Sequence, residues 1–188
     1  MASKAVAGAM MTVEEYLALG EDPPMTRLEL SEGRLIVAPS SNYIHNAVRD
    51  ELRQMVAGFA QTNAFGVVTS ETDVRLGEAT VRRPDVCFFA KERLRGSDPE
   101  ALPLPAPDLV FEILSPHDRR RDLELKVRQY LAAGVQAVWL LDPRRGSAAR
   151  YSTDHEPEQR ATLEEPDLLP GWVVTLDDLF AAARRGWD

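Results

Sequence analysis

Leu109-Val-Phe-Glu-Ile-Leu114 and the residues that follow it give the clearest indication of the fold. It is apolar at every position except Glu112, which is typical of a strand buried on both faces. Ser115-Pro116-His117-Asp118 predicts a helix start, and a helix over 122–133 leads to a second apolar run over 135–142. Strand, helix and strand in this order predict a right-handed parallel crossover unit.

The rest of the chain adds strands and helices of mixed order. Thr12-Val-Glu-Glu15 is a capping box, so a short helix begins there and runs to about Leu19. Periodicity and turn residues predict the other elements, which are a hairpin of strands 27–30 and 34–38, an amphipathic helix at 42–60, strands at 67–76 and 81–90 joined as a hairpin, a surface loop at 91–107, added strands at 148–153 and 172–176, and a closing helix at 177–184.

The bulk composition indicates an ordinary globular protein. A length of 188 residues favours a single domain over 1–188, in which we expect 1–11 to be a loose N-terminus. No apolar run has the length needed to span a bilayer, and the short apolar start is followed at once by Glu14 and Glu15. The lone Cys87 excludes an internal disulfide and a multi-cysteine zinc site. We therefore expect a cytoplasmic protein with no membrane partner.

The net charge of −8 argues against a protein that coats nucleic acid by bulk electrostatics. Three arginine groups, Arg82-Arg83, Arg119-Arg120-Arg121 and Arg144-Arg145, supply local positive charge. A binding groove needs local rather than global charge, so these groups are candidates for a phosphate contact. The alternative is that each is a solvated surface group.

Two acids lie where acids are costly. Alternation places Glu112 on the same strand face as Val110 and Leu114, and Asp85 directly precedes the apolar Val86-Cys-Phe-Phe89. A carboxylate in such surroundings needs a cation, a proton or a metal ion. Two acids on neighbouring strands suit a hard divalent cation such as Mg²⁺. The alternatives are that Glu112 pairs with an arginine, or that Asp85 caps a turn.

Lys126 is the third candidate, and its position follows from geometry. Lys126 lies eight residues into a helix that begins near Asp118, about 12 Å along the axis at ~1.5 Å per residue. Glu112 lies four residues before Pro116, about 13 Å back along the strand at ~3.3 Å per residue. The two are level, so Lys126 is predicted beside Glu112. The alternative is a lysine that extends to the surface.

A lysine beside two metal-binding acids suits phosphodiester hydrolysis. It orients or helps to deprotonate the attacking water and neutralises charge on the phosphate. Arg119 and Arg120 lie at a helix N-terminus, where the macrodipole disfavours cations, so a compensating phosphate is one explanation. Plain surface exposure is the simpler one.

These residues resemble the Uma-two family, whose members have a restriction-endonuclease-like fold of the PD-(D/E)xK nuclease type. The matching stretches lie in family order over most of 11–151 and are Met11 to Leu19, Leu28 to Gly33, Ala38-Pro-Ser40 with His45, Val81 to Val86, Pro107 to Pro116, Asp122 with Lys126 and Tyr130, and Ala133 to Pro143.

The resemblance implies an α/β fold, with a mixed central sheet and flanking helices in the order αβββαβ. It also implies a Mg²⁺ (or Mn²⁺) site at Asp85 and Glu112, with DNA as substrate. Glu29 becomes a candidate third acid, with a solvent-facing strand residue as the alternative. His45 and Tyr130 join Arg119 and Arg120 as candidate substrate contacts, although for His45 an ordinary helix-start residue is the favoured alternative.

The chain departs from the general nuclease signature at Leu114, where the signature lysine stands two residues after the acid. Lys126 is then its natural replacement. Three hypotheses follow: a metal-dependent DNA endonuclease, expected as a homodimer so that both strands are cut; a nuclease-fold binding or assembly module without catalysis; and a hydrolase of a small phosphorylated substrate.

Overall fold

The larger of the two main sheets contains the predicted parallel unit. The computed structural model describes residues 10–116 and 118–186. In the larger sheet β7 and β8 run parallel and the other neighbours are antiparallel. Its strands, in spatial order, are β10 (His155–Arg160), β9 (Ser147–Ser152), β8 (Ala137–Asp142), β7 (Leu109–Ile113), β6 (Val86–Ala90) and β3 (Gly66–Thr69). The prediction of parallel strands on either side of a helix is confirmed.

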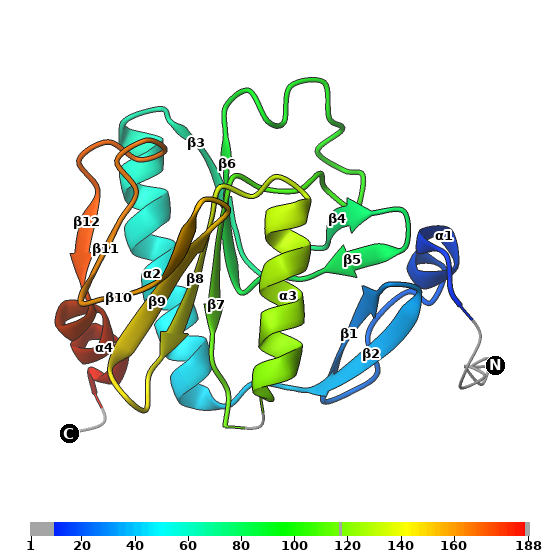
Figure 1. The fold of residues 1–188 in the computed structure, drawn as a ribbon, viewed down its shortest axis with the longest axis horizontal. Coiled ribbons are helices and arrows are strands. Elements are labelled where there is room, and N and C mark those ends of the chain that lie inside the picture. The colour runs from blue at the N-terminus through cyan, green and yellow to red at the C-terminus, as the bar shows by residue number, and fades with distance from the viewer. Residues whose placement is uncertain (1–9, 117, 187–188) are drawn as a thin grey trace.

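A smaller sheet stands beside the larger one (Figure 1). Its strands, in spatial order, are β2 (Arg34–Pro39), β1 (Thr26–Ser31), β5 (Thr80–Arg82) and β4 (Val74–Gly77). Strands β1 and β2 form the predicted hairpin, in which Glu32 and Gly33 take positive φ values of 50° and 75°. Glycine tolerates that conformation because it has no Cβ. A separate pair joins β11 (Thr162–Glu164) to β12 (Val173–Thr175).

Four helices complete the described chain: α1 (Val13–Leu17), α2 (Tyr43–Thr62), α3 (Arg120–Ala132) and α4 (Leu176–Arg184). Helices α2 and α4 pack on one face of the larger sheet and α3 packs on the other (Figure 1). The elements α2, β3, β6, β7, α3 and β8 follow the predicted order αβββαβ, with the β4–β5 hairpin inserted after β3. The fold class is therefore confirmed. No described helix combines the length and apolarity needed to cross a membrane.

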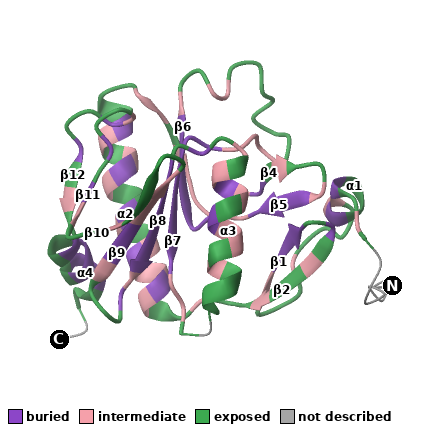
Figure 2. Ribbon diagram, in the orientation of Figure 1, coloured by how far each residue is buried: buried purple, intermediate pink, exposed green. Residues whose placement is uncertain are grey.

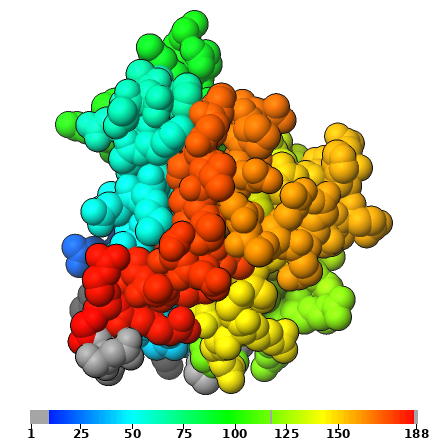
Figure 3. Space-filling view, turned by 90° about the vertical axis from the view of Figure 1, so that its left-hand side faces the viewer, coloured from blue at the N-terminus to red at the C-terminus, as the bar shows by residue number. Residues whose placement is uncertain are grey.

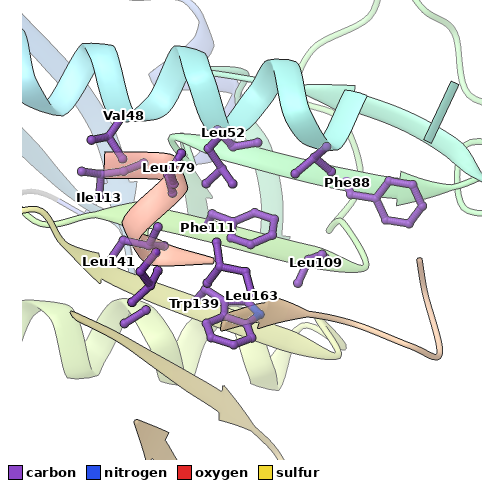
Figure 4. Packing of buried hydrophobic residues seen from close by; sticks show 14 of the residues in the cluster. Val48, Leu52, Phe88, Leu109, Phe111, Ile113, Trp139, Leu141, Leu163 and Leu179 are labelled. Atoms are coloured by element: carbon purple, nitrogen blue, oxygen red, sulfur yellow. The ribbon is translucent and has the colours of Figure 1, made fainter. Parts of the chain in front are cut away.

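The main hydrophobic core lies between the larger sheet and the helices α2 and α4. Val48 and Leu52 of α2 point toward Phe111 and Trp139 of the sheet (Figure 4), and Leu179 of α4 belongs to the same cluster. The central strands β6, β7 and β8 are buried, whereas β10 is mostly exposed and α3 is exposed only along its outer side (Figure 2). Strands that are apolar on both faces form the middle of the sheet because both faces are covered.

Two sequence predictions about strands are wrong. The predicted strand at 67–76 is two strands, β3 and β4, and the one at 81–90 is also two, β5 and β6. In each case one half belongs to each main sheet. The chain breaks at Glu71, which has a φ of 50°, and at Pro84, which cannot donate a ladder hydrogen bond. The turn at Gly77 was expected correctly, since β4 and β5 pair antiparallel across it.

Smaller differences concern the ends of the chain and the start of α3. Helix α3 begins at Arg120, two residues later than the start near Asp118 assumed from sequence. Strands β10 and β11 were not expected. Of the predicted loose N-terminus, residues 1–9 lie outside the described part of the chain. Met11 is not loose, because its amide donates to the Gly33 carbonyl at 2.7 Å.

Candidate active site

A cluster of charged side chains, buried except for the half-buried Arg27 and Lys126, lies where the two main sheets meet. We call it the charged cluster, and it consists of Arg27, Glu29, His45, Arg82, Asp85, Glu112 and Lys126. The smaller sheet contributes Glu29 from β1, the larger sheet contributes Glu112 from β7, and Asp85 lies on the segment that joins the sheets. These three acids are 6%, 4% and 1% exposed, respectively. The structure therefore brings together the three acids that the sequence singled out.

Asp85 is held by three donors. Its Oδ2 accepts from the Ile113 amide at 2.8 Å and lies 3.1 Å from His45 Nε2, and its Oδ1 accepts from Arg27 at 3.0 Å. Burial raises the pKa of Asp85, but the hydrogen bond and charge of His45, and the charges of Arg27 and Lys126, together lower it below its ordinary value. The Ile113 bond places Asp85 beside the neighbouring Glu112. Asp85 is thus an ionised carboxylate next to Glu112.

Glu112 meets Lys126, as the helix-and-strand geometry predicted. Lys126 Nζ lies 2.9 Å from each carboxylate oxygen of Glu112, and Tyr130 donates its hydroxyl to Glu112 Oε1 at 2.7 Å. Burial has the largest effect on the pKa of Glu112 and raises it. The charge of Lys126 lowers this pKa and the charge of Asp85 raises it, so that the net shift is upward. The contact between Lys126 and Glu112 is confirmed, even though α3 begins two residues later than assumed.

Glu29 is a buried member of the charged cluster, so the alternative of a solvent-facing residue is wrong. Its carboxylate lies 3.2 Å from Lys126 Nζ and accepts from Arg82 at 2.8 Å and from the Arg83 amide at 3.1 Å. Burial raises the pKa of Glu29, but Lys126, Arg27 and Arg82 outweigh it and lower the pKa to about 2. Lys126 therefore bridges two acids from two different sheets.

The favoured interpretation of His45 as an ordinary helix-start residue is wrong. It is 4% exposed, and its Nε2 faces Asp85. Burial lowers the pKa of His45, but the hydrogen bond and charge of Asp85 raise it by more. Its Nδ1 is buried without a hydrogen-bond partner among the described atoms. The spacing of His45, Val48 and Leu52 is that of one helix stripe, which could have revealed its inward direction.

Two cations of the charged cluster were missed or misread. Arg27 was not considered, yet it bonds Asp85 and lies 3.6 Å from Glu29. It stands two positions before Glu29 on the same strand, so alternation could have placed both on one face. Arg82 was taken as a candidate phosphate contact, but it is 5% exposed and binds Glu29, Ser31 and Gln129 within the protein. Its positive charge balances the negative charge of the buried Glu29.

The predicted substrate contacts divide into two groups. Tyr130 is fully buried behind Glu112, so it positions that carboxylate and is not open to a substrate, contrary to the prediction. Burial and the charge of Glu112 raise the pKa of Tyr130 well above its ordinary value, so its hydroxyl stays a donor. Arg119 and Arg120 are exposed at the start of α3, where Arg120 pairs with Glu124 at 2.7 Å. Neither arginine contacts the charged cluster among the described residues.

The donor chemistry of the two acids fits a divalent cation that takes few protein ligands. A carboxylate has about four lone-pair directions. Asp85 uses three of them, for Arg27, His45 and the Ile113 amide, and Glu112 uses three, for Tyr130 and the two contacts of Lys126. Each acid keeps about one direction, and Mg²⁺ commonly binds one or two carboxylates with water and phosphate. Among residues 10–116 and 118–186, no group of three or more His, Cys, Asp or Glu residues is arranged to hold a metal ion.

The αβββαβ order of the elements is that of a restriction-endonuclease-like fold, in which the acids lie at the junction of the sheets. A family model, Uma2, described as "Putative restriction endonuclease", matches residues 13–180. The chain belongs to this family. It is also similar to the crystal structure of a "putative nuclease belonging to DUF820" from Anabaena variabilis ATCC 29413, with a TM-score of 0.81 and 24% sequence identity over 92% of this chain and 99% of that one. This likeness supports the fold. Comparison with curated proteins gives no match.

Proposed function

We propose that the protein is a metal-dependent nuclease that hydrolyses phosphodiester bonds in DNA, with Mg²⁺ or Mn²⁺ as its cation. One observation carries the proposal: Lys126 Nζ lies between Glu112 and Glu29, and Asp85 is bonded to the residue that follows Glu112. A lysine and acids at such distances suit in-line attack by water on a phosphate. Family membership agrees with nuclease chemistry.

In this proposal Asp85 and Glu112 hold the cation. When bound, the cation supplies positive charge that stabilises the phosphate during reaction. Arg27 and His45 keep Asp85 ionised and fix its orientation, because each faces one of its oxygens. Tyr130 does the same for Glu112 through its hydroxyl. The carboxylates are therefore oriented before a substrate arrives.

Lys126 takes the role of the signature lysine that is replaced by Leu114. Its ammonium orients the attacking water and neutralises charge on the phosphate oxygens. Glu29 and Glu112 orient the ammonium of Lys126, since its Nζ lies within 3.2 Å of both carboxylates. A lysine delivered from α3 reaches the same carboxylate as one delivered from β7, because helix and strand run side by side.

The first test compares wild type with Asp85→Asn. Purified protein with Mn²⁺ is expected to cut DNA, and Asp85→Asn is expected to lose at least ~100-fold in rate, because it removes a charged cation ligand. Calorimetry should show weaker Mn²⁺ binding by the same variant. Asp177→Asn, an exposed acid of α4, is the matched control and should match wild type.

Binding without cleavage would support the alternative of an assembly module. If wild type binds DNA but leaves it intact with either metal, and Mn²⁺ binding is the same in wild type and in Asp85→Asn, the nuclease proposal is wrong. The expected homodimer stays a prediction. Light scattering on the purified chain measures it.

A further inference from the structure

We propose that the substrate is single-stranded nucleic acid, which reaches the charged cluster through a polar hollow beside Arg27. This inference rests on the proposed nuclease function and names its substrate class. The hollow has a volume of about 440 Å³, and its wall includes Arg27, Ser40, Ser41, Asn46 and Arg49. These residues come from β1, from the segment after β2, and from the first two turns of α2.

Arg27 connects the hollow to the charged cluster. The same guanidinium that lines the hollow donates to Asp85 Oδ1 at 3.0 Å. Asp85 and Glu112 are almost completely buried, so a phosphate has to enter the protein surface to approach them. Arg27 lies between this hollow and Asp85, so the hollow ends one side chain away from that carboxylate.

The size of the hollow favours one flexible strand over a duplex. Its volume falls within the range of small-molecule pockets, roughly 300–1,000 Å³, which suits one or two nucleotide units. A duplex is stiff, with a persistence length of about 150 base pairs, and cannot bend one phosphate inward over so short a distance without a large energetic cost. A single strand has no such constraint, because its backbone rotates freely at each nucleotide.

The lining suits a sugar-phosphate backbone. Serine, asparagine and arginine are among the side chains that donate hydrogen bonds to phosphate and sugar oxygens. Two acids also line the hollow, and both are paired with its arginines: Glu71 with Arg49 at 2.7 Å, and Asp22 with Arg83. These pairs hold the arginines in place and limit the net positive charge, so binding by hydrogen bonds matters more than bulk attraction.

A second hollow lies beside the first along α2. It has a volume of about 500 Å³, shares Asn46 with the first hollow, and has Tyr43, Arg185 and the acids Asp50 and Glu51 in its wall. The outer side of α2 lies next to α4 on this face of the molecule (Figure 3). Tyr43 is 53% exposed, and exposed aromatic rings stack on the bases of single strands. Two neighbouring hollows suit a strand of several nucleotides better than one small phosphorylated compound.

The test measures binding separately from cleavage. Fluorescence anisotropy with Ca²⁺ compares an oligonucleotide of about twenty nucleotides with its duplex, using the full chain. The single strand is expected to bind at least ~10-fold more tightly. Arg49→Ala is expected to weaken single-strand binding about 10-fold, and Tyr43→Ala about 5-fold or more. Arg53→Ala, which removes an exposed arginine one turn further along α2 and outside both hollows, should change affinity less than about 2-fold.

Several outcomes would overturn the inference. Equal or tighter binding of the duplex would do so, as would equal effects of Arg49→Ala and Arg53→Ala, or a mononucleotide that competes as well as the oligonucleotide. With Mn²⁺, a duplex that carries a single-stranded tail should be cut only in the tail. Cleavage within the duplex contradicts the substrate class and leaves the nuclease proposal intact. Preferred binding of the single strand with no cleavage of any substrate contradicts the nuclease proposal alone.

Discussion

Phe111 and Glu112 are neighbours on β7, yet the side chains that surround them differ in character. Phe111 packs into the apolar layer under α2 and α4, against Trp172 at a ring distance of 5.9 Å. Glu112 points to the other face, where Lys126 and Tyr130 bind its two oxygens. Both side chains are almost completely buried. Both positions are therefore buried, but Phe111 lies among apolar side chains and Glu112 is bound by a charged and a polar one.

The apolar layer stabilises the fold, whereas the charged cluster costs stability that other interactions must offset. Apolar burial contributes roughly 25 cal/mol per Å² and depends little on direction. Buried ion pairs often gain no more than they lose on leaving water, and apolar replacements of similar volume are often neutral or stabilising. A protein that keeps such a cluster has a reason other than stability, which supports a functional role for it.

The largest effect on stability is expected in the apolar layer. Phe111→Ala removes a fully buried ring and leaves a cavity among well-packed neighbours. The free energy of unfolding should fall by about 3–5 kcal/mol. Urea denaturation with an unchanged slope measures it. A loss below about 1 kcal/mol would mean that this layer is loosely packed.

Lys126→Met should lower the free energy of unfolding by about 3 kcal/mol, for a different reason. It leaves Glu112 and Glu29 without the ammonium that both contact. The double variant Lys126→Met, Glu112→Gln should recover part of that loss, because fewer unpaired charges are then buried. Phe111→Ala should show no such recovery when combined with Glu112→Gln. Additive losses in the lysine double variant would contradict the ion-pair description.

The buried carboxylate of Glu29 makes the stability of the protein depend on acid pH. The pKa of Glu29 falls from 4.5 to about 2 on folding, so the unfolded chain binds more protons in that range. The contribution of Glu29 is then complete above pH 4.5 and is lost as the pH falls toward 2. We expect the wild type to lose on the order of 2 kcal/mol more than Glu29→Gln over this range. Parallel pH profiles of the two proteins would contradict this.

The smallest effect is expected on the surface of α3. Arg120 pairs with Glu124 while 93% of its side chain is exposed, and exposed pairs contribute little. Arg120→Ala should leave the free energy of unfolding unchanged within the error of the measurement. Chemical denaturation checks this. A measurable loss would show that the start of α3 matters for stability.

Much of the fold could be predicted from sequence because its strongest signals are local. The apolar strands β7 and β8, the capping box at Thr12 and the periodicity of α2 each depend on nearby residues. The contact between Lys126 and Glu112 was also predictable, since a crossover unit has regular dimensions. The length of each element and the rise per residue were enough.

The rest depends on how two sheets meet, which no local pattern specifies. The hairpin of β1 and β2 reads the same whether it extends the larger sheet or joins a smaller one. For that reason the contact of Arg27 with Asp85 was not foreseen. The strands at 67–76 and 81–90 were likewise read as continuous, because apolar residues resume after each break. His45 was misread because histidine is compatible with either side of a helix.

The central claim is that Lys126 serves the chemistry of Asp85 and Glu112 and not only their packing. The most direct measurement is the rate of Mn²⁺-dependent DNA cleavage by wild type, Lys126→Met and Arg128→Met, the last being an exposed cation two residues away on α3. We expect Lys126→Met to fold and to lose at least about 100-fold in rate, with Arg128→Met within about 2-fold of wild type. Equal rates for Lys126→Met and wild type would contradict the claim.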